Sequence, residues 1–121
     1  MTSEGRASRI ARQIKEDLST ILLFDVGDPR LSGVFITDVN VDRELAYANI
    51  FVSTLEGVER EQEVLDGLNR AKGYMRSQLA QRIQLRSFPN LRFNWDPTPE
   101  NAERIERLID SLSKDDNSED D

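Results

Sequence analysis

The feature that most restricts the fold of this 121-residue chain is a helical pattern too long for so small a domain. Apolar residues recur every three or four positions through 59–85: Val64, Leu68, Ala71, Met75 and Leu79. A straight helix over this segment would span about 40 Å at ~1.5 Å per residue. Gly73 lies inside the pattern and weakens it, so we expect the helix to bend there.

Other segments alternate between helix and strand patterns. Residues 7–24 read as an amphipathic helix, and residues 33–41 and 45–54 as two strands joined by a polar turn. Pro89 ends the long helix, and residues 91–95 alternate as a third strand. Thr98 as N-cap and Pro99 as first residue predict a last helix. Its apolar stripe would be Ala102, Ile105, Leu108, Ile109 and Leu112.

This order predicts a single α+β domain over residues 1–112. Three strands cannot bury an apolar face by themselves, so the helices should pack on one side of a small sheet and leave its other face uncovered. Residues 113–121 contain no large apolar residue and include five acids, which predicts a disordered acidic tail.

The net charge of −7 argues against nucleic acid as a partner, but it averages over blocks of opposite sign. Residues 56–66 and the tail are acidic, whereas residues 67–95 contain no acid at all. The cations of that stretch are Arg70, Lys72, Arg76, Arg82, Arg86 and Arg92, and residues 1–15 add Arg6, Arg9, Arg12 and Lys15. Such a run is either a solvated helix face or an electrostatic footprint for RNA.

Gly73 itself allows two interpretations. A helix broken there exposes backbone N–H groups as an anion site, surrounded by Arg70, Lys72 and Arg76. Alternatively, the glycine only lets another helix approach closely. The aromatic residues Phe88, Phe93 and Trp95 raise a similar choice between a base-stacking platform and the core, and their alternation along the third strand favours the core.

Catalysis has few groups to draw on, because the chain contains neither His nor Cys. This excludes His-based triads, thiolate clusters, disulfides and most zinc sites. Loop aspartates such as Asp28 and Asp42 are typical of turn chemistry rather than of a carboxylate site. We therefore expect no enzyme, cofactor or metal. No secretory signal or membrane span is evident, which predicts a cytoplasmic protein.

Short strings in a fixed order make the chain resemble the ribosome-binding factor A family over about residues 6–112. They are Arg9-Ile10-Ala11, Asp28-Pro29-Arg30-Leu31, Ile36-Thr37-Asp38-Val39, Phe51-Val52-Ser53, Ala71-Lys72-Gly73 and Pro89-Asn90-Leu91-Arg92-Phe93. The resemblance implies a type II KH-like fold, in which an Ala-x-Gly kink at Ala71 and Gly73 replaces the usual glycine-rich RNA-binding loop.

The resemblance also implies a function. Family members bind free 30S small ribosomal subunits, contact 16S rRNA, assist its late maturation including the 5′ end, support growth in the cold, and are released by an assembly GTPase. We expect a monomer without catalytic activity that contacts rRNA, with ribosomal proteins nearby. The predicted contact residues are Arg6, Arg9, Arg12, Lys15, Arg70, Lys72, Arg76, Arg82 and Arg86. The alternative is an adaptor that holds a basic ribosomal protein with its acidic segments 56–66 and 113–121.

Overall fold

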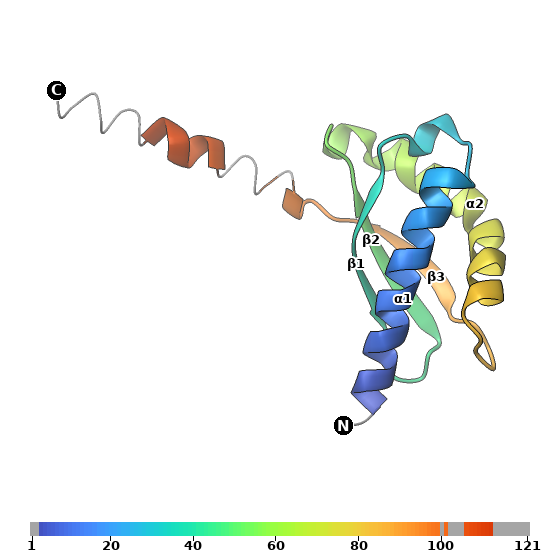
Figure 1. Ribbon diagram of the computed structural model, residues 1–121. Helices are drawn as coiled ribbons and strands as arrows, with labels where there is room; N and C mark the ends of the chain where they lie inside the picture. Colours follow the sequence, from blue (N-terminus) through green and yellow to red (C-terminus); the bar gives the residue numbers. More distant parts are fainter. Residues whose placement is uncertain (1–2, 100, 102–105, 113–121) are drawn as a thin grey trace.

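Two helices lie against one face of a three-stranded sheet in the computed structural model, which describes residues 3–99, 101 and 106–112 (Figure 1). The elements follow in the order α1 (Ser3–Phe24), β1 (Phe35–Val41), β2 (Tyr47–Ser53), α2 (Glu61–Arg82) and β3 (Asn90–Trp95). Short 3-10 helices, η1 (Pro29–Leu31) and η2 (Val58–Arg60), precede β1 and α2. The predicted α+β class, the single sheet and the KH-like element order are confirmed.

The sheet has the order β1-β2-β3 and mixes two kinds of pairing. β1 and β2 form an antiparallel hairpin, whereas β3 runs parallel to β2. Val39, Ile50 and Phe93 lie in one cross-strand row on the helix-covered face. Because parallel strands need a long crossover connection, α2 must carry the chain back along the whole sheet.

The core lies between this sheet and the two helices. α1 buries the predicted stripe, in which Ile14, Leu18 and Ile21 are completely buried. Leu68, Met75 and Leu79 of α2 are also fully buried. Phe88 is buried, and Phe93 and Trp95 are half-buried and packed against the core, so the core interpretation of these aromatic residues is confirmed.

α2 bends but does not break. It is one continuous α-helix from Glu61 to Arg82, and Figure 1 shows its first part crossing the end of the sheet and its second part running along it. The expected bend is therefore present, but the separation into two helices with free N–H groups is wrong. The close-approach alternative for Gly73 is also wrong, because a Cβ atom there would meet nothing within 4 Å.

The glycine of α2 that lies in close contact with another element is Gly67, six positions before Gly73. A Cβ atom on Gly67 would lie 3.0 Å from Cδ2 of Leu31 and 3.4 Å from Cβ of Arg30. Leu31 belongs to η1 and is buried. The missing side chain therefore lets the first half of α2 pack directly on η1.

The last predicted helix does not cover the sheet in the described residues. Residues 98–99, 101 and 106–112 are helical, but Leu108, Ile109 and Leu112 are each more than half exposed. Ala102 and Ile105, as well as the tail 113–121, lie outside the described residues. The predicted N-cap role of Thr98 is also wrong. Its own backbone N–H donates to the side chain of Asp96, whose Oδ1 lies 2.9 Å away.

The two glycines of α2 should respond oppositely to alanine. We expect Gly73→Ala to stabilise the protein by about 1 kcal/mol, because alanine favours a helix and has open space there. Gly67→Ala should instead destabilise it by about 1 kcal/mol, because the added methyl overpacks Leu31. Urea denaturation of both variants tests this, and equal stabilisation by the two would contradict it.

Three carboxylates should make the fold sensitive to acid. The Arg30 side chain lowers the pKa of Asp28, the backbone N–H of Tyr47 lowers that of Asp42, and the Thr37 hydroxyl lowers that of Asp96. Since each pKa is lower in the folded than in the unfolded state, this stabilisation is complete above about pH 4 and is lost as the pH falls through the folded values.

We expect the free energy of unfolding to decrease on acidification below about pH 4. Asp96→Asn should be less stable than the parent at pH 7 and should lose less stability between neutral and acidic pH, because the Thr37 interaction no longer titrates. Denaturation curves at several pH values measure both effects. The same pH dependence in parent and variant would show that this carboxylate does not contribute.

Candidate RNA-binding surface

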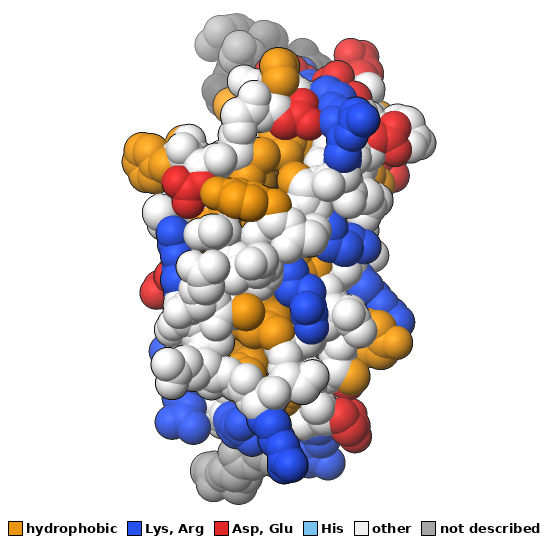
Figure 2. Space-filling view, turned by 90° about the vertical axis from the view of Figure 1, so that its right-hand side faces the viewer, with side chains coloured by type: hydrophobic (Ala, Val, Ile, Leu, Met, Phe, Trp, Pro, Cys, Tyr) orange, Lys and Arg blue, Asp and Glu red, His pale blue; other side chains and the backbone are white. Residues whose placement is uncertain are grey.

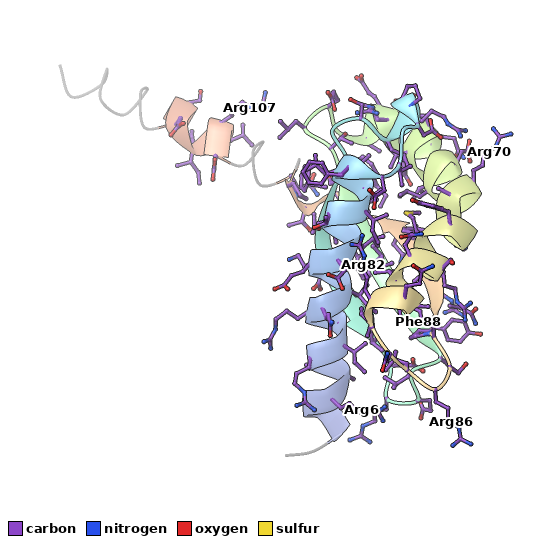
Figure 3. All side chains as sticks on the ribbon, turned by 45° about the vertical axis from the view of Figure 1, so that its right-hand side comes forward. Arg6, Arg70, Arg82, Arg86, Phe88 and Arg107 are labelled. Atoms are coloured by element: carbon purple, nitrogen blue, oxygen red, sulfur yellow. The ribbon has the colours of Figure 1, made fainter. Side chains whose placement is uncertain are left out.

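Cations from two helices meet at one end of the molecule. Arg6 and Arg9 of α1 and Arg82 at the end of α2 line a groove of about 410 Å³, which we call the basic groove. Its other lining residues are Ile10, Gln13, Ile83, Gln84 and Leu85. Arg86 follows in the loop to β3 and is exposed. Figure 3 shows Arg6 and Arg86 at the same end of the molecule, with Arg82 between the helices.

The basic groove contains no acidic side chain in its lining. One carboxylate approaches from outside, since Oδ2 of Asp25 lies 3.5 Å from Nη2 of Arg82. Arg6, Arg9 and Arg86 have no ion pair or hydrogen bond among the residues that the structure describes. A cluster of guanidinium groups beside glutamine amides, in which Arg6 and Arg9 are unpaired among the described residues, is suited to phosphate oxygens, for which arginine offers two parallel donors.

Arg12 and Lys15 point away from this groove. They line a second hollow of about 280 Å³ on the other side of α1, together with Asp38 of β1. Lys15 donates from Nζ to the carbonyl oxygen of Thr37 at 3.4 Å. The four predicted cations of the first helix are thus divided between two sides of that helix.

Arg70 and Lys72 form a third location on the first half of α2. Figure 3 shows Arg70 at the opposite end of the molecule from Arg6 and Arg86. Arg70 is exposed, and its charge contributes to the lowered pKa of Asp28. Next to Lys72, the open surface at Gly73 leaves the helix backbone accessible. Ala71 is half-buried and packs against the core.

Arg76 is half-buried and binds the chain that precedes β3. Its Nε donates to the carbonyl oxygen of Pro89 at 3.1 Å, and its Nη2 donates to that of Phe88 at 2.6 Å. These bonds hold the loop before β3 against α2. Sequence reasoning grouped Arg76 with the surface cations because carbonyl partners leave no signal in a charge pattern.

Arg92 belongs to the acid-free stretch 67–95 but was not among the predicted contact residues. Arg92 of β3 lies over the ring of Tyr47, 3.5 Å from its centroid. Both residues are on the sheet face that the helices leave uncovered, because the outward positions of β3 and β2 are adjacent in register. Only the strand pairing reveals this contact.

The two loop aspartates Asp28 and Asp42 bind groups of their own turns. Asp28 accepts three hydrogen bonds from the Arg30 side chain, and Oδ1 of Asp42 accepts the backbone N–H groups of Ala46 and Tyr47. Both aspartates therefore serve turns, as the sequence predicted. Within the described ranges, no group of three or more acidic residues is arranged to hold a metal ion. None of the helices searched there is long and apolar enough to cross a membrane.

The opposite end of the domain is acidic and apolar. Figure 2 shows Lys and Arg side chains gathered at the lower end, whereas most of the acidic side chains lie in the upper part, beside a further cation and apolar side chains. Near that upper end, Arg60 binds Glu63 at 2.7 Å and Glu56 at 3.2 Å, and it donates to the carbonyl oxygens of Ser32 and Arg30. At this end of the domain the described cations Arg30 and Arg60 are thus paired with acids of the same chain.

The fold and the basic groove define this protein as a small α+β domain of the KH-like class. The model of the ribosome-binding factor A family matches residues 6–109. The chain is 41% identical over 113 residues to ribosome-binding factor A of Alcanivorax borkumensis, covering 93% of this chain and 82% of that protein. The chain belongs to the ribosome-binding factor A family.

A crystal structure and a map-fitted homology model of a relative share the fold. The crystal structure of ribosome-binding factor A from Thermus thermophilus has a TM-score of 0.66 at 24% identity, with 74% of this chain and 93% of that chain covered. A homology model of the Thermus thermophilus factor, fitted into a cryo-EM map of a 30S complex of that factor, has a TM-score of 0.57 at 25% identity. There, 69% of this chain and 87% of that chain are covered.

Arg76 should be important for stability rather than for RNA binding alone. We expect Arg76→Met to lower the free energy of unfolding by about 1.5–3 kcal/mol, because two buried carbonyl groups lose a charged donor. The matched variant Arg70→Met should change it by less than about 0.5 kcal/mol, because Arg70 is exposed. Chemical denaturation measures the free energy of unfolding of both variants. Equal losses would contradict a stabilising role for the hydrogen bonds of Arg76.

Proposed function

We propose that this protein binds the free 30S ribosomal subunit through 16S rRNA and assists late maturation of that RNA, including its 5′ end, without catalysing a reaction. It acts in the cytoplasm as a monomer, supports growth in the cold, and is released by an assembly GTPase. These details follow the family, and the Thermus thermophilus relative in a 30S complex supports the choice of partner.

The observation that carries the proposal is the basic groove. It lies in a chain with a net charge of −7, yet its lining contains three arginines and no acid. Phosphate contacts of this kind position a protein without reading sequence, so specificity comes from the shape of the folded RNA and from neighbouring ribosomal proteins. The other predicted cations contribute from separate places, Arg12 and Lys15 beside β1 and Arg70 and Lys72 beside Gly73.

The adaptor alternative depends on the acidic segments 56–66 and 113–121. Within the first, Glu56 and Glu63 already pair with Arg60 of the same chain, which leaves less charge for a basic partner. Deleting residues 113–121 separates the two proposals. Unchanged or tighter association with the subunit supports RNA contact, and lost association supports the adaptor.

Binding to purified 30S subunits should weaken steeply with salt. The double variant Arg6→Glu/Arg9→Glu removes two phosphate contacts of the basic groove and should reduce the slope of log K against log salt concentration by about 1.5. Sedimentation of the protein with subunits at several salt concentrations measures this slope. Neither arginine forms an ion pair or hydrogen bond among the described residues, so the variant should remain folded.

The variant Arg70→Glu/Lys72→Glu changes the net charge by the same amount at the other end of the domain. Its loss of affinity should be smaller, because these residues lie outside the basic groove. Equal losses from both pairs would mean that binding follows net charge and would refute the assignment to the groove. Binding that does not depend on salt would refute RNA contact altogether.

A further inference from the structure

An apolar groove lies at the end of the domain opposite the basic groove. It has a volume of about 580 Å³ between the last turns of α1, the following loop and the start of β1. Its apolar lining includes Leu22, Leu23, Val26, Val34, Phe35 and Ile36. Leu23 is 74% exposed and Phe35 is 36% exposed. Concave apolar surface of this extent on a small domain marks a place where something packs.

The charge at this groove favours an apolar occupant. Asp28 is the acidic residue in its lining, and its carboxylate is already bound to the Arg30 side chain, with Oδ2 2.6 Å from Nη2. No Lys or Arg lines the groove. A phosphate or a strongly charged peptide therefore has no counterpart here, whereas an apolar helix face does.

The same chain carries an apolar stripe without a partner among the described residues. In the helical residues 106–112, Leu108, Ile109 and Leu112 are 60%, 56% and 63% exposed. Their spacing of one and four positions puts them on one side of the helix. A helix this short gains its stability from tertiary packing rather than from its own hydrogen bonds, so an exposed stripe of this kind needs a surface to cover it.

The chain that leads from β3 to residues 106–112 starts beside the apolar groove. Trp95, the last residue of β3, pairs with Val52, which in turn pairs with Ile36 in the groove. Asp96 then fastens the departing chain to β1, because its Oδ2 accepts a hydrogen bond from Oγ1 of Thr37 at 2.5 Å. Its backbone N–H donates to the carbonyl oxygen of Val52 at 2.8 Å.

The tether is long enough for the stripe to reach the groove. Twelve positions separate Asp96 from Leu108, which corresponds to about 18 Å in a helix and about 40 Å in an extended chain. A tether of this length holds its two ends at an effective concentration in the millimolar range. A weak apolar contact within the chain is therefore favoured over the same contact between chains.

We propose that residues 106–112 dock into the apolar groove, with Leu108, Ile109 and Leu112 against Leu22, Leu23 and Val26. The docked segment then completes the apolar layer at the end of α1. This inference concerns the end of the domain opposite the basic groove and does not depend on the proposed function.

Cysteine pairs test the docking directly, because the natural chain contains no Cys. We expect Leu23→Cys/Ile109→Cys to form an intramolecular disulfide under mild oxidation at least tenfold faster than Gln13→Cys/Ile109→Cys. Gln13 is the matched control, because it is an exposed residue of the same helix that lies in the basic groove. Equal rates for the two pairs would refute the docking. A disulfide that forms only between chains would show that a second copy occupies the groove instead.

A second measurement avoids introduced cysteines. Leu108→Ser/Leu112→Ser should lower the thermal midpoint of the full chain by several degrees and increase the fluorescence of a dye that binds apolar surface. The control Glu106→Ser/Asp110→Ser changes exposed polar residues of the same segment and should have neither effect. If the leucine variant behaves like the control, the segment does not dock, and the groove is then a surface for another molecule.

Discussion

The parallel pairing of β3 with β2 is the constraint on which the rest of the structure depends. Because both strands run in the same direction, the chain must return from one end of the sheet to the other between Ser53 and Asn90. α2 makes that return, and two contacts hold it in place. Gly67 allows its first half to pack on Leu31, and Arg76 binds the carbonyl groups that precede β3.

The same constraint gives the two ends of the domain different chemistry. The end of α2 arrives beside the start of α1, so Arg82 joins Arg6 and Arg9 in the basic groove. β3 ends where β1 begins, so the C-terminal segment leaves beside the apolar groove. One crossover helix thereby separates the basic groove from the apolar groove, although the cations and apolar residues involved are scattered along the sequence.

Local patterns predicted the secondary structure well because they report what a single segment buries. The stripe of α1, the alternation of the three strands and the stop before Pro89 all follow from this. Patterns failed where the decisive partner was distant. Gly73 resembled a break, yet the helix is continuous, and Leu31 makes Gly67 the glycine in close contact. Likewise, Arg76 resembled a surface cation although its partners are carbonyl groups 12 and 13 positions away.

By itself, the sequence determined the α+β class, the element order, the family resemblance and the existence of an acid-free basic stretch, because each depends on residue type and spacing. Only the tertiary structure decided which cations act together. Arg9 and Arg12, three positions apart on α1, line different hollows, whereas Arg6 and Arg82, 76 positions apart in the sequence, line the same groove. The physical reason is that residues at i and i+3 are neighbours on a helix surface, so their separation depends on which elements pack beside the helix, and the sequence of the helix does not contain that information.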